Sequence, residues 1–447
     1  MFKKTVFVHF ILSLLFFSGL LRAEESIGTF SQNERILIVA PHPDDESLGL
    51  GGVLQHAVSA GADIRVLYLT NGELNEVASI FYQKRPLLLR ADFIKNGLIR
   101  KREATEAMAF LGLGAEKLVF FGYPDGGMLN IWLKYWGNSN PFRSLFTRIN
   151  KVPYKDDFSV GNYYRGDEIV RDLEKILLSF QPARIFVTAP FDLNTDHQAA
   201  YLYLEVALLN LGEQMTPKPA VHLYVIHAHQ WPQPKKFVPE AALQVPSHIE
   251  WAQDVRWRQV PLSIGESKKK AEAILKYKSQ IAYKKNFLLA FARSNEIVAD
   301  YPKEKLVPMA VPASGTDALF KASARNGDVL YKIYGKELWV QIPLSNMLDE
   351  MGVLSSYVFS YRRGFLFSDM TKLSFKLFGN KIFVYDGFKI FYDPGLVYRF
   401  EKDRIFIRVP MRVLKNPDHL FVSTRNAKEG MSLDFGAWKL LEIVKSS

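Results

Sequence analysis

Apolar runs of strand length alternate with helical segments across residues 34–298, and this alternation constrains the fold more than any other feature of the sequence. The segments 46–60, 99–111, 167–179 and 197–211 place apolar residues at helical spacing. Strands that alternate with helices pair in parallel, with helices packed on both faces of the sheet. The sequence therefore predicts an α/β domain with a Rossmann-like, mostly parallel sheet. The predicted strands are RILIVA (35–40), DIRVLYLT (63–70), KLVFFG (117–122), RIFVTAP (184–190) and VHLYVIHAH (221–229).

The character of the chain changes after residue 298. The segment 299–316 contains VPMAVPASG (307–315), whose prolines and glycine are typical of a linker. Beyond it, short apolar runs separated by Gly, Asp and Asn predict an all-β, sandwich-like domain over residues 317–447. Its aromatic side chains permit two interpretations, a carbohydrate-binding surface or a packing module that supports the first domain. The candidates for sugar stacking are Trp339, Tyr357, Tyr361, Tyr398 and Trp438.

The N-terminus has the features of an export signal. Lys3 and Lys4 precede the apolar run 5–17, and Ala23 offers a small residue at a cleavage point. A membrane anchor is the alternative, but the apolar run is short for a span and charged residues follow it closely. We therefore expect a signal peptide over residues 1–23 and a mature protein that is periplasmic or extracellular.

Charge and cysteine content narrow the classes of partner and metal site. The chain has no cysteine, which excludes disulfides and thiolate ligands, so any metal must be held by His, Asp or Glu. Its formal net charge is +11, and removal of Lys3, Lys4 and Arg22 with the signal peptide leaves +8. An exported basic protein is expected to associate peripherally with anionic envelope polymers or lipid head groups. No basic run resembles a nucleic-acid-binding motif, and the sequence leaves the oligomeric state open.

The first predicted strand runs directly into the turn PHPDDE (41–46), where like charges are crowded together. The two prolines stiffen this turn. His42 and Asp45 are three residues apart, close enough to bind one ion together. Asp44 can face the same cavity without binding that ion. A helix N-cap would explain one of these acids, but it would not explain a histidine and two acids packed around prolines.

His197 is the natural third ligand, because it follows another strand in the stretch FDLNTDH (191–197). Ligands of such sheets lie at the carboxyl ends of the strands. The alternative is that His197 merely starts the next helix. Two imidazoles and one carboxylate with an open position are typical of a catalytic zinc site, in which iron could substitute. Such a site activates water for attack on an amide or ester, and Asp44 is placed to act as the general base.

Five separated motifs follow one another along residues 34–298. They are PHPDDESLGLGG (41–52), TNGE (70–73), RKRE (100–103), FGYPDG (121–126) and NTDHQAA (194–200). In this order they resemble the PIG-L/LmbE-like zinc-dependent N-acetylglucosaminyl deacetylases. The resemblance implies a zinc ion on His42, Asp45 and His197, with Asp44 as the base. It also implies that Arg100 and Asp125 bind the substrate sugar, where the residues alone would suggest an exposed helix charge and a turn acid.

One position departs from the family pattern. Family members often have HPDH where this chain has NTDH, so Asn194 replaces a histidine that stabilises the oxyanion or protonates the leaving amine. Asparagine can donate a hydrogen bond but cannot transfer a proton at neutral pH. His227 and His229 share one face of a predicted strand at its carboxyl end, and either could supply the proton. If neither reaches the pocket, Asp44 would have to return it.

These observations together predict an exported zinc-dependent hydrolase that removes acetyl groups from N-acetylated amino sugars. The signal peptide, the extra domain and an aromatic-rich insertion over residues 128–166 favour a glycan or glycoconjugate substrate, although these aromatic residues could equally form the core of the insertion. One alternative is a zinc amidohydrolase that cleaves another acyl amide. The other is a non-catalytic carbohydrate-binding protein, which Asn194 alone supports.

Overall fold

The computed structural model describes residues 25–74, 89–246, 255–311, 329–344, 352–401, 404–428, 431–434 and 436–444. The predicted signal peptide, residues 1–23, lies outside these ranges. Within them, no helix has both the length and the apolar character needed to cross a bilayer.

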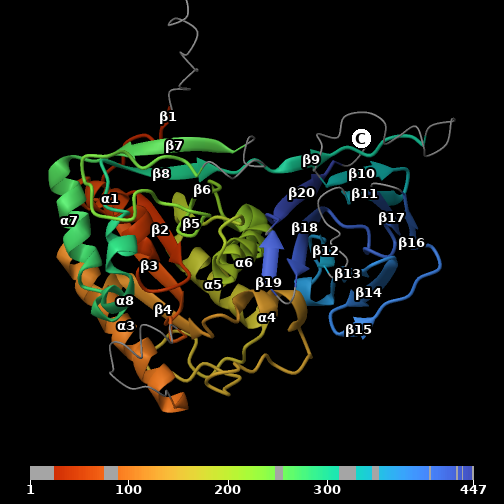
Figure 1. The fold of residues 1–447 in the computed structure, drawn as a ribbon, viewed down its shortest axis with the longest axis horizontal. Helices are drawn as coiled ribbons and strands as arrows, with labels where there is room; N and C mark the ends of the chain where they lie inside the picture. Colours follow the sequence, from red (N-terminus) through yellow and green to blue (C-terminus); the bar gives the residue numbers. More distant parts are fainter. Residues whose placement is uncertain are drawn as a thin grey trace, which may run out of the picture.

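An eight-stranded sheet forms the centre of the N-terminal half (Figure 1), in the order β1-β7-β8-β6-β5-β2-β3-β4. The five strands from β6 to β4 pair in parallel, and β8 is antiparallel to both of its neighbours. The predicted Rossmann-like sheet is therefore confirmed. The strands are β1 (Glu25–Ser26), β2 (Arg35–Ala40), β3 (Asp63–Thr70), β4 (Leu118–Tyr123), β5 (Arg184–Thr188), β6 (Ala220–Tyr224), β7 (Arg256–Pro261) and β8 (Asn295–Asp300).

Helices cover both faces of this sheet. In Figure 1, α1, α3, α7 and α8 lie on one side, and α4, α5 and α6 lie on the side that faces the C-terminal half. Between α7 and α8 the chain turns at Tyr277 and buries that ring. The helices are α1 (Asp45–Ser59), α3 (Arg90–Leu111), α4 (Met128–Lys134), α5 (Gly166–Phe180), α6 (Thr195–Leu211), α7 (Ile264–Ile274) and α8 (Lys278–Leu289).

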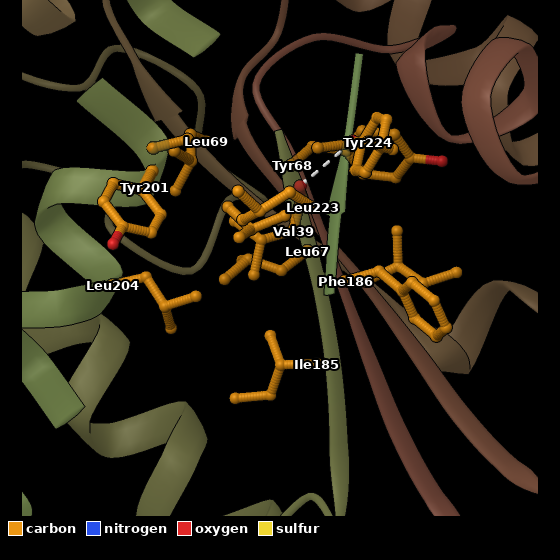
Figure 2. Close-up of a cluster of buried hydrophobic side chains, with 14 of the residues drawn as sticks. Val39, Leu67, Tyr68, Leu69, Ile185, Phe186, Tyr201, Leu204, Leu223 and Tyr224 are labelled. Atoms are coloured by element: carbon orange, nitrogen blue, oxygen red, sulfur yellow. Dashed lines mark hydrogen bonds between the residues drawn. The ribbon is translucent and has the colours of Figure 1, made fainter. Parts of the chain in front are cut away.

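The sheet core consists of apolar side chains from adjacent parallel strands. Figure 2 shows Val39, Leu67, Ile185 and Leu223 from four neighbouring strands, together with the hydroxyl of Tyr224, which donates to the carbonyl of Val39 at 3.1 Å. Strands buried on both faces are near-continuous apolar runs, which is why the sequence predicted them well. The chain leaves β2 toward β3 on one side and later returns to β5 on the other, so the loops after β2 and β5 diverge. Such a reversal opens a crevice at the carboxyl ends of these strands.

The C-terminal half is a sandwich of two mainly antiparallel sheets, as predicted. One sheet has the order β10-β11-β17-β16, and the other has the order β15-β14-β13-β12-β18-β20-β9, with β19 beside β18. Apolar side chains from both sheets, such as Val340 and Phe375, meet in one core. The strands are β9 (Glu304–Leu306), β10 (Leu330–Tyr334), β11 (Glu337–Pro343), β12 (Gly352–Tyr361), β13 (Lys372–Phe378), β14 (Lys381–Asp386), β15 (Lys389–Ile390), β16 (Val397–Phe400), β17 (Arg404–Pro410), β18 (His419–Lys428), β19 (Met431–Asp434) and β20 (Lys439–Ile443).

The segment predicted as a linker, 299–316, is tied to both halves over much of its length. It contains the end of β8 and all of β9, which pairs in parallel with β20. Lys303 Nζ lies 2.7 Å from the carboxylate of Glu205 on α6. Residues 312–316 of the segment lie outside the described ranges.

An aromatic cluster joins the two halves. The ring of Trp132 on α4 is fully buried, and its centroid lies 5.2 Å from that of Phe367, 5.3 Å from that of Phe421 and 5.9 Å from that of Trp438. Three of the proposed sugar-stacking residues, Tyr357, Tyr361 and Trp438, are buried in or beside this cluster. Because buried rings cannot stack on an external sugar, these three favour the packing interpretation. Trp339 is half-buried, and Tyr398 is exposed.

Truncation of the central ring should weaken the junction between the halves. Trp132→Ala is expected to lower the free energy of unfolding by about 3–5 kcal/mol, because it removes a large buried ring and leaves a cavity. Urea unfolding of the metal-free protein measures this change. Leu366→Ala is the control, since that side chain is 70% exposed, and it should change the free energy by no more than about 0.5 kcal/mol. Equal midpoints for the two variants would contradict the role assigned to Trp132.

Candidate metal centre

The turn between β2 and α1 is held from several directions. The backbone N–H and the hydroxyl of Thr70 both donate to the carbonyl of Pro41, at 3.0 and 2.9 Å. Asp44 has a φ of +134° and a ψ of −27°, a conformation outside the left-handed helical region that is uncommon for residues other than glycine. Its N–H donates to the carboxylate of Glu46 at 3.1 Å, and Glu46 also accepts the hydroxyl of Tyr277. These hydrogen bonds fix the conformation of the turn.

Three potential ligand atoms converge at this turn. Oδ2 of Asp45 lies 3.2 Å from Nδ1 of His42 and 3.2 Å from Nε2 of His197, and the two nitrogens are 3.3 Å apart. All three side chains are buried. Zinc held tetrahedrally at 2.0–2.1 Å separates its ligand atoms by about 3.3 Å. The donor set and its spacing therefore fit a divalent cation of this kind.

Asp192 orients His197 from the other side. Its Oδ2 lies 3.2 Å from Nδ1 of His197, and it also accepts the backbone N–H groups of Ile226 and His227 at 2.8 and 2.9 Å. A carboxylate at Nδ1 favours the tautomer whose Nε2 lone pair is free for a metal. Burial opposes the ionised form of Asp192, but His197 nearby holds the pKa of Asp192 below its ordinary value.

His42 has carboxylates on its second ring nitrogen. Its Nε2 lies 3.1 Å from Oδ1 of Asp125 and 3.4 Å from Oδ2 of Asp196. Asp196 is itself fixed by the backbone N–H groups of Gly126 and Met128, at 2.6 and 3.1 Å. Burial opposes the ionised form of Asp125, but the imidazole of His42 holds its pKa below the ordinary value. Asp125 therefore faces His42 as well as the cavity.

Arg100 holds Asp44 at the cavity wall. Its side chain is only 4% exposed, so it is no surface charge. Nη2 of Arg100 lies 3.0 Å from Oδ1 of Asp44 and also donates to the carbonyl of Pro43, while Nη1 donates to that of Gly72. Any Cβ at Gly72 would overlap the guanidinium, which explains the glycine in TNGE. Burial raises the pKa of Asp44 to about 6, and Arg100 limits that rise.

A cavity of about 200 Å³ contains most of these groups. A larger cleft of about 1100 Å³ between α6, β6 and the C-terminal half contains none of them, so the smaller cavity is the candidate active site. Residues from α8, which the sequence had not indicated, line the cavity together with the turn. The lining residues are His42, Asp44, Asp45, Leu48, Leu74, Arg100, Asp125, Asn194, Ile226, His227, Gln280, Lys284, Phe287 and Leu288.

The two candidate proton donors separate in the structure. Strand β6 ends at Tyr224, so His227 and His229 lie in the following loop and not on the strand as predicted. His227 lines the cavity, and its ring centroid is 5.0 Å from that of His197. His229 is exposed and is not among the lining residues. Asn194 caps α6, because its side-chain oxygen accepts the N–H of Asp196 at 2.8 Å, and the residue is also among those that line the cavity.

Comparison with known proteins gives a family match for part of the chain. Residues 37–208 match the family model described as PIG-L, GlcNAc-PI de-N-acetylase. A 1D-myo-inositol 2-acetamido-2-deoxy-alpha-D-glucopyranoside deacetylase from Mycobacterium avium is 42% identical over 84 residues, which are 19% of this chain and 27% of that protein. The protein of the same name from Kineococcus radiotolerans is 35% identical over 113 residues, 24% of this chain and 29% of its own length. The chain thus spans less than a third of these relatives.

Solved structures that match part of this chain include the N,N'-diacetylchitobiose deacetylase from Pyrococcus horikoshii. It has 18% sequence identity and a TM-score of 0.36, and the match covers 64% of this chain and 86% of that one. A conserved protein from Thermus thermophilus has 22% identity and a TM-score of 0.34, with 57% of this chain and 84% of that chain covered.

Proposed function

We propose that the protein is a zinc-dependent N-deacetylase, and the match of residues 37–208 to the PIG-L family model supports this proposal. Its reaction would be hydrolysis of the acetamide of an N-acetylated amino sugar to a free amine and acetate. The observation that carries the proposal is the convergence of His42, Asp45 and His197 within 3.3 Å of one another, with Asp44 beside them. The named acetamido-sugar deacetylases among the relatives support an amino-sugar substrate.

The residues have separate parts in this proposal. His42, Asp45 and His197 would hold zinc, with iron(II) as a substitute, and a cation there supplies a Lewis acid that activates water and polarises the acyl carbonyl. Asp44 does not belong to the ligand set and accepts the proton of the attacking water. Arg100 keeps Asp44 in position. Asp44 then returns this proton to the departing nitrogen, because burial lowers the pKa of His227 to about 4 and leaves that imidazole neutral, although both residues line the cavity.

Other groups bind or orient the substrate. The side-chain amide of Asn194 can donate a hydrogen bond to the developing oxyanion but cannot protonate the amine. Asp125 and the Nε–H of Arg100 are assigned to the sugar. That N–H is buried and has no hydrogen-bond partner within the described part of the chain, which leaves a donor for a ligand. A glycan or glycoconjugate outside the cytoplasm remains the proposed setting, because the expected signal peptide directs the protein there.

Acetate release tests the proposal. The purified protein is incubated with N-acetylglucosamine oligomers and, separately, with N-acetyl amino-acid amides, with and without a chelator. The expected result is chelator-sensitive acetate release from the sugars at a rate at least about tenfold higher than from the amides, since the cavity groups are matched to sugar hydroxyls. Faster cleavage of the amides would identify a different amidohydrolase. Sugar binding without acetate release would identify a non-catalytic binding protein.

A further inference from the structure

A buried arginine of the C-terminal sandwich reaches the helix that carries His197. Arg425 lies on β18, opposite Ser355 of β12, and is only 9% exposed. The two faces of β18 have different surroundings. Val422 belongs to the sandwich core, whereas Phe421 packs on the N-terminal half. The guanidinium of Arg425 is on the Phe421 side and donates to the side-chain carbonyl of Gln198 on α6.

Burial of a guanidinium costs free energy unless its N–H groups find hydrogen-bond partners. Burial lowers the pKa of Arg425 to about 10, and within the described residues no carboxylate forms an ion pair with it. The guanidinium also donates a 3.4 Å hydrogen bond to Ser423 and lies over the face of Trp438, with its carbon 5.5 Å from the ring centroid. A buried cation is retained only where hydrogen bonds compensate its lost hydration. The bond to Gln198 is the one that crosses to the N-terminal half.

Gln198 connects Arg425 to the residues around the metal centre. It follows His197 directly, is fully buried, and donates its amide to the carbonyl of Asp192 at 2.7 Å. The carboxylate of Asp192 lies 3.2 Å from Nδ1 of His197. The C-terminal half also fixes this loop through the N–H of Trp438, which donates to the carbonyl of Pro190 at 3.2 Å. The loop that orients His197 is therefore held by residues more than 220 positions further along the chain.

We infer that Arg425 is a positioning residue for His197, acting through Gln198 and Asp192, and that the C-terminal half thereby completes the metal centre. This inference rests on the proposed function for the identity of the site. It assigns the C-terminal half a role in metal affinity that does not require that half to bind a sugar.

The zinc dissociation constant of the full chain tests this inference, measured by competition with a chromophoric chelator. Arg425→Met should weaken zinc binding about tenfold, as substitutions behind metal ligands do. Its metal-free form should melt at a temperature no more than a few degrees lower, because removal of the buried charge offsets part of the cost of leaving the carbonyl of Gln198 without its donor. Zinc affinity is measured well below that melting temperature, where a merely structural role of Arg425 would leave the affinity of the folded protein unchanged. Arg425→Lys keeps a donor for Gln198 and should stay within about threefold of the original affinity.

Lys303→Met is the matched control, because it removes a different contact between the two halves on the same helix, the ion pair with Glu205. It should change zinc affinity by no more than about twofold, since partly exposed pairs contribute little. Gln198→Ala should reproduce the Arg425→Met effect, and the double variant should be no weaker than Gln198→Ala alone. Unchanged zinc affinity in Arg425→Met, or an equal loss in Lys303→Met, would overturn the inference. Absence of zinc binding in the original protein would instead refute the proposed function.

Discussion

Asp44→Asn is expected to retain its metal and to lose about 10²–10⁴-fold in kcat, the contribution typical of a general base. Asparagine has nearly the same shape as aspartate, and the backbone N–H of this position keeps its hydrogen bond to Glu46, so the backbone of the turn should persist. It cannot accept the proton of the attacking water. Alanine would be a poorer substitution, because it would strain the turn as well as remove the carboxylate.

The measurements for this variant are zinc content, kcat on an acetylated sugar and thermal melting. Some loss of stability is expected, because Arg100 keeps its charge after its buried partner at 3.0 Å has become neutral. Asp156→Asn, at an exposed aspartate, is the control and should keep full activity. If Asp44→Asn turned over substrate at the original rate, another residue would have to be the base.

Asp45→Ala is expected to lose both metal and activity. Its Oδ2 lies 3.2 Å from both imidazole nitrogens of the ligand set, and no other carboxylate in the described part of the chain is placed between them. The zinc dissociation constant should rise by more than about 100-fold, because substitutions behind the ligands alone cost 10–100-fold. Activity should fall to that of the original protein treated with chelator. Equilibrium dialysis against zinc measures the affinity.

The contrast between the two aspartates is the informative result. Metal retention with loss of turnover at Asp44, and loss of both at Asp45, would separate the roles assigned to these adjacent residues. Stoichiometric zinc in Asp45→Ala would show that the ion binds elsewhere, for example among Asp192, His197 and His227, which also bring three ligand atoms together.

In the N-terminal half, the sequence predicted most closely the strands that are buried on both faces of the sheet. The limits of β2 and β3 match the predicted runs residue for residue, because a parallel strand covered on both faces is an unbroken apolar run. The predicted strand 221–229 extends beyond β6, which ends at Tyr224. Val225 and Ile226 are buried in the loop that follows the strand, and burial of a loop resembles burial of a strand in the sequence.

The candidate site was predictable only in part. His42, Asp45 and His197 were predicted as ligands because each lies where the chain passes from a strand into the following helix, the region where a doubly wound sheet collects its ligands. Asp192 and Asp196 lie in the same stretch as His197, and the rule that selected His197 applied equally to them. Their partners are backbone N–H groups of other loops, whose positions the sequence pattern does not contain. Nothing near Arg425 in the sequence pointed to the metal centre, because that contact depends on how the two halves pack.

Anomalous diffraction at the zinc absorption edge, from crystals of the protein loaded with zinc, tests the central claim most directly. We expect one strong peak within bonding distance of Nδ1 of His42, Nε2 of His197 and a carboxylate oxygen of Asp45. A peak bound to other residues, or none at full loading, would contradict the assignment of these three side chains as the ligands of the metal.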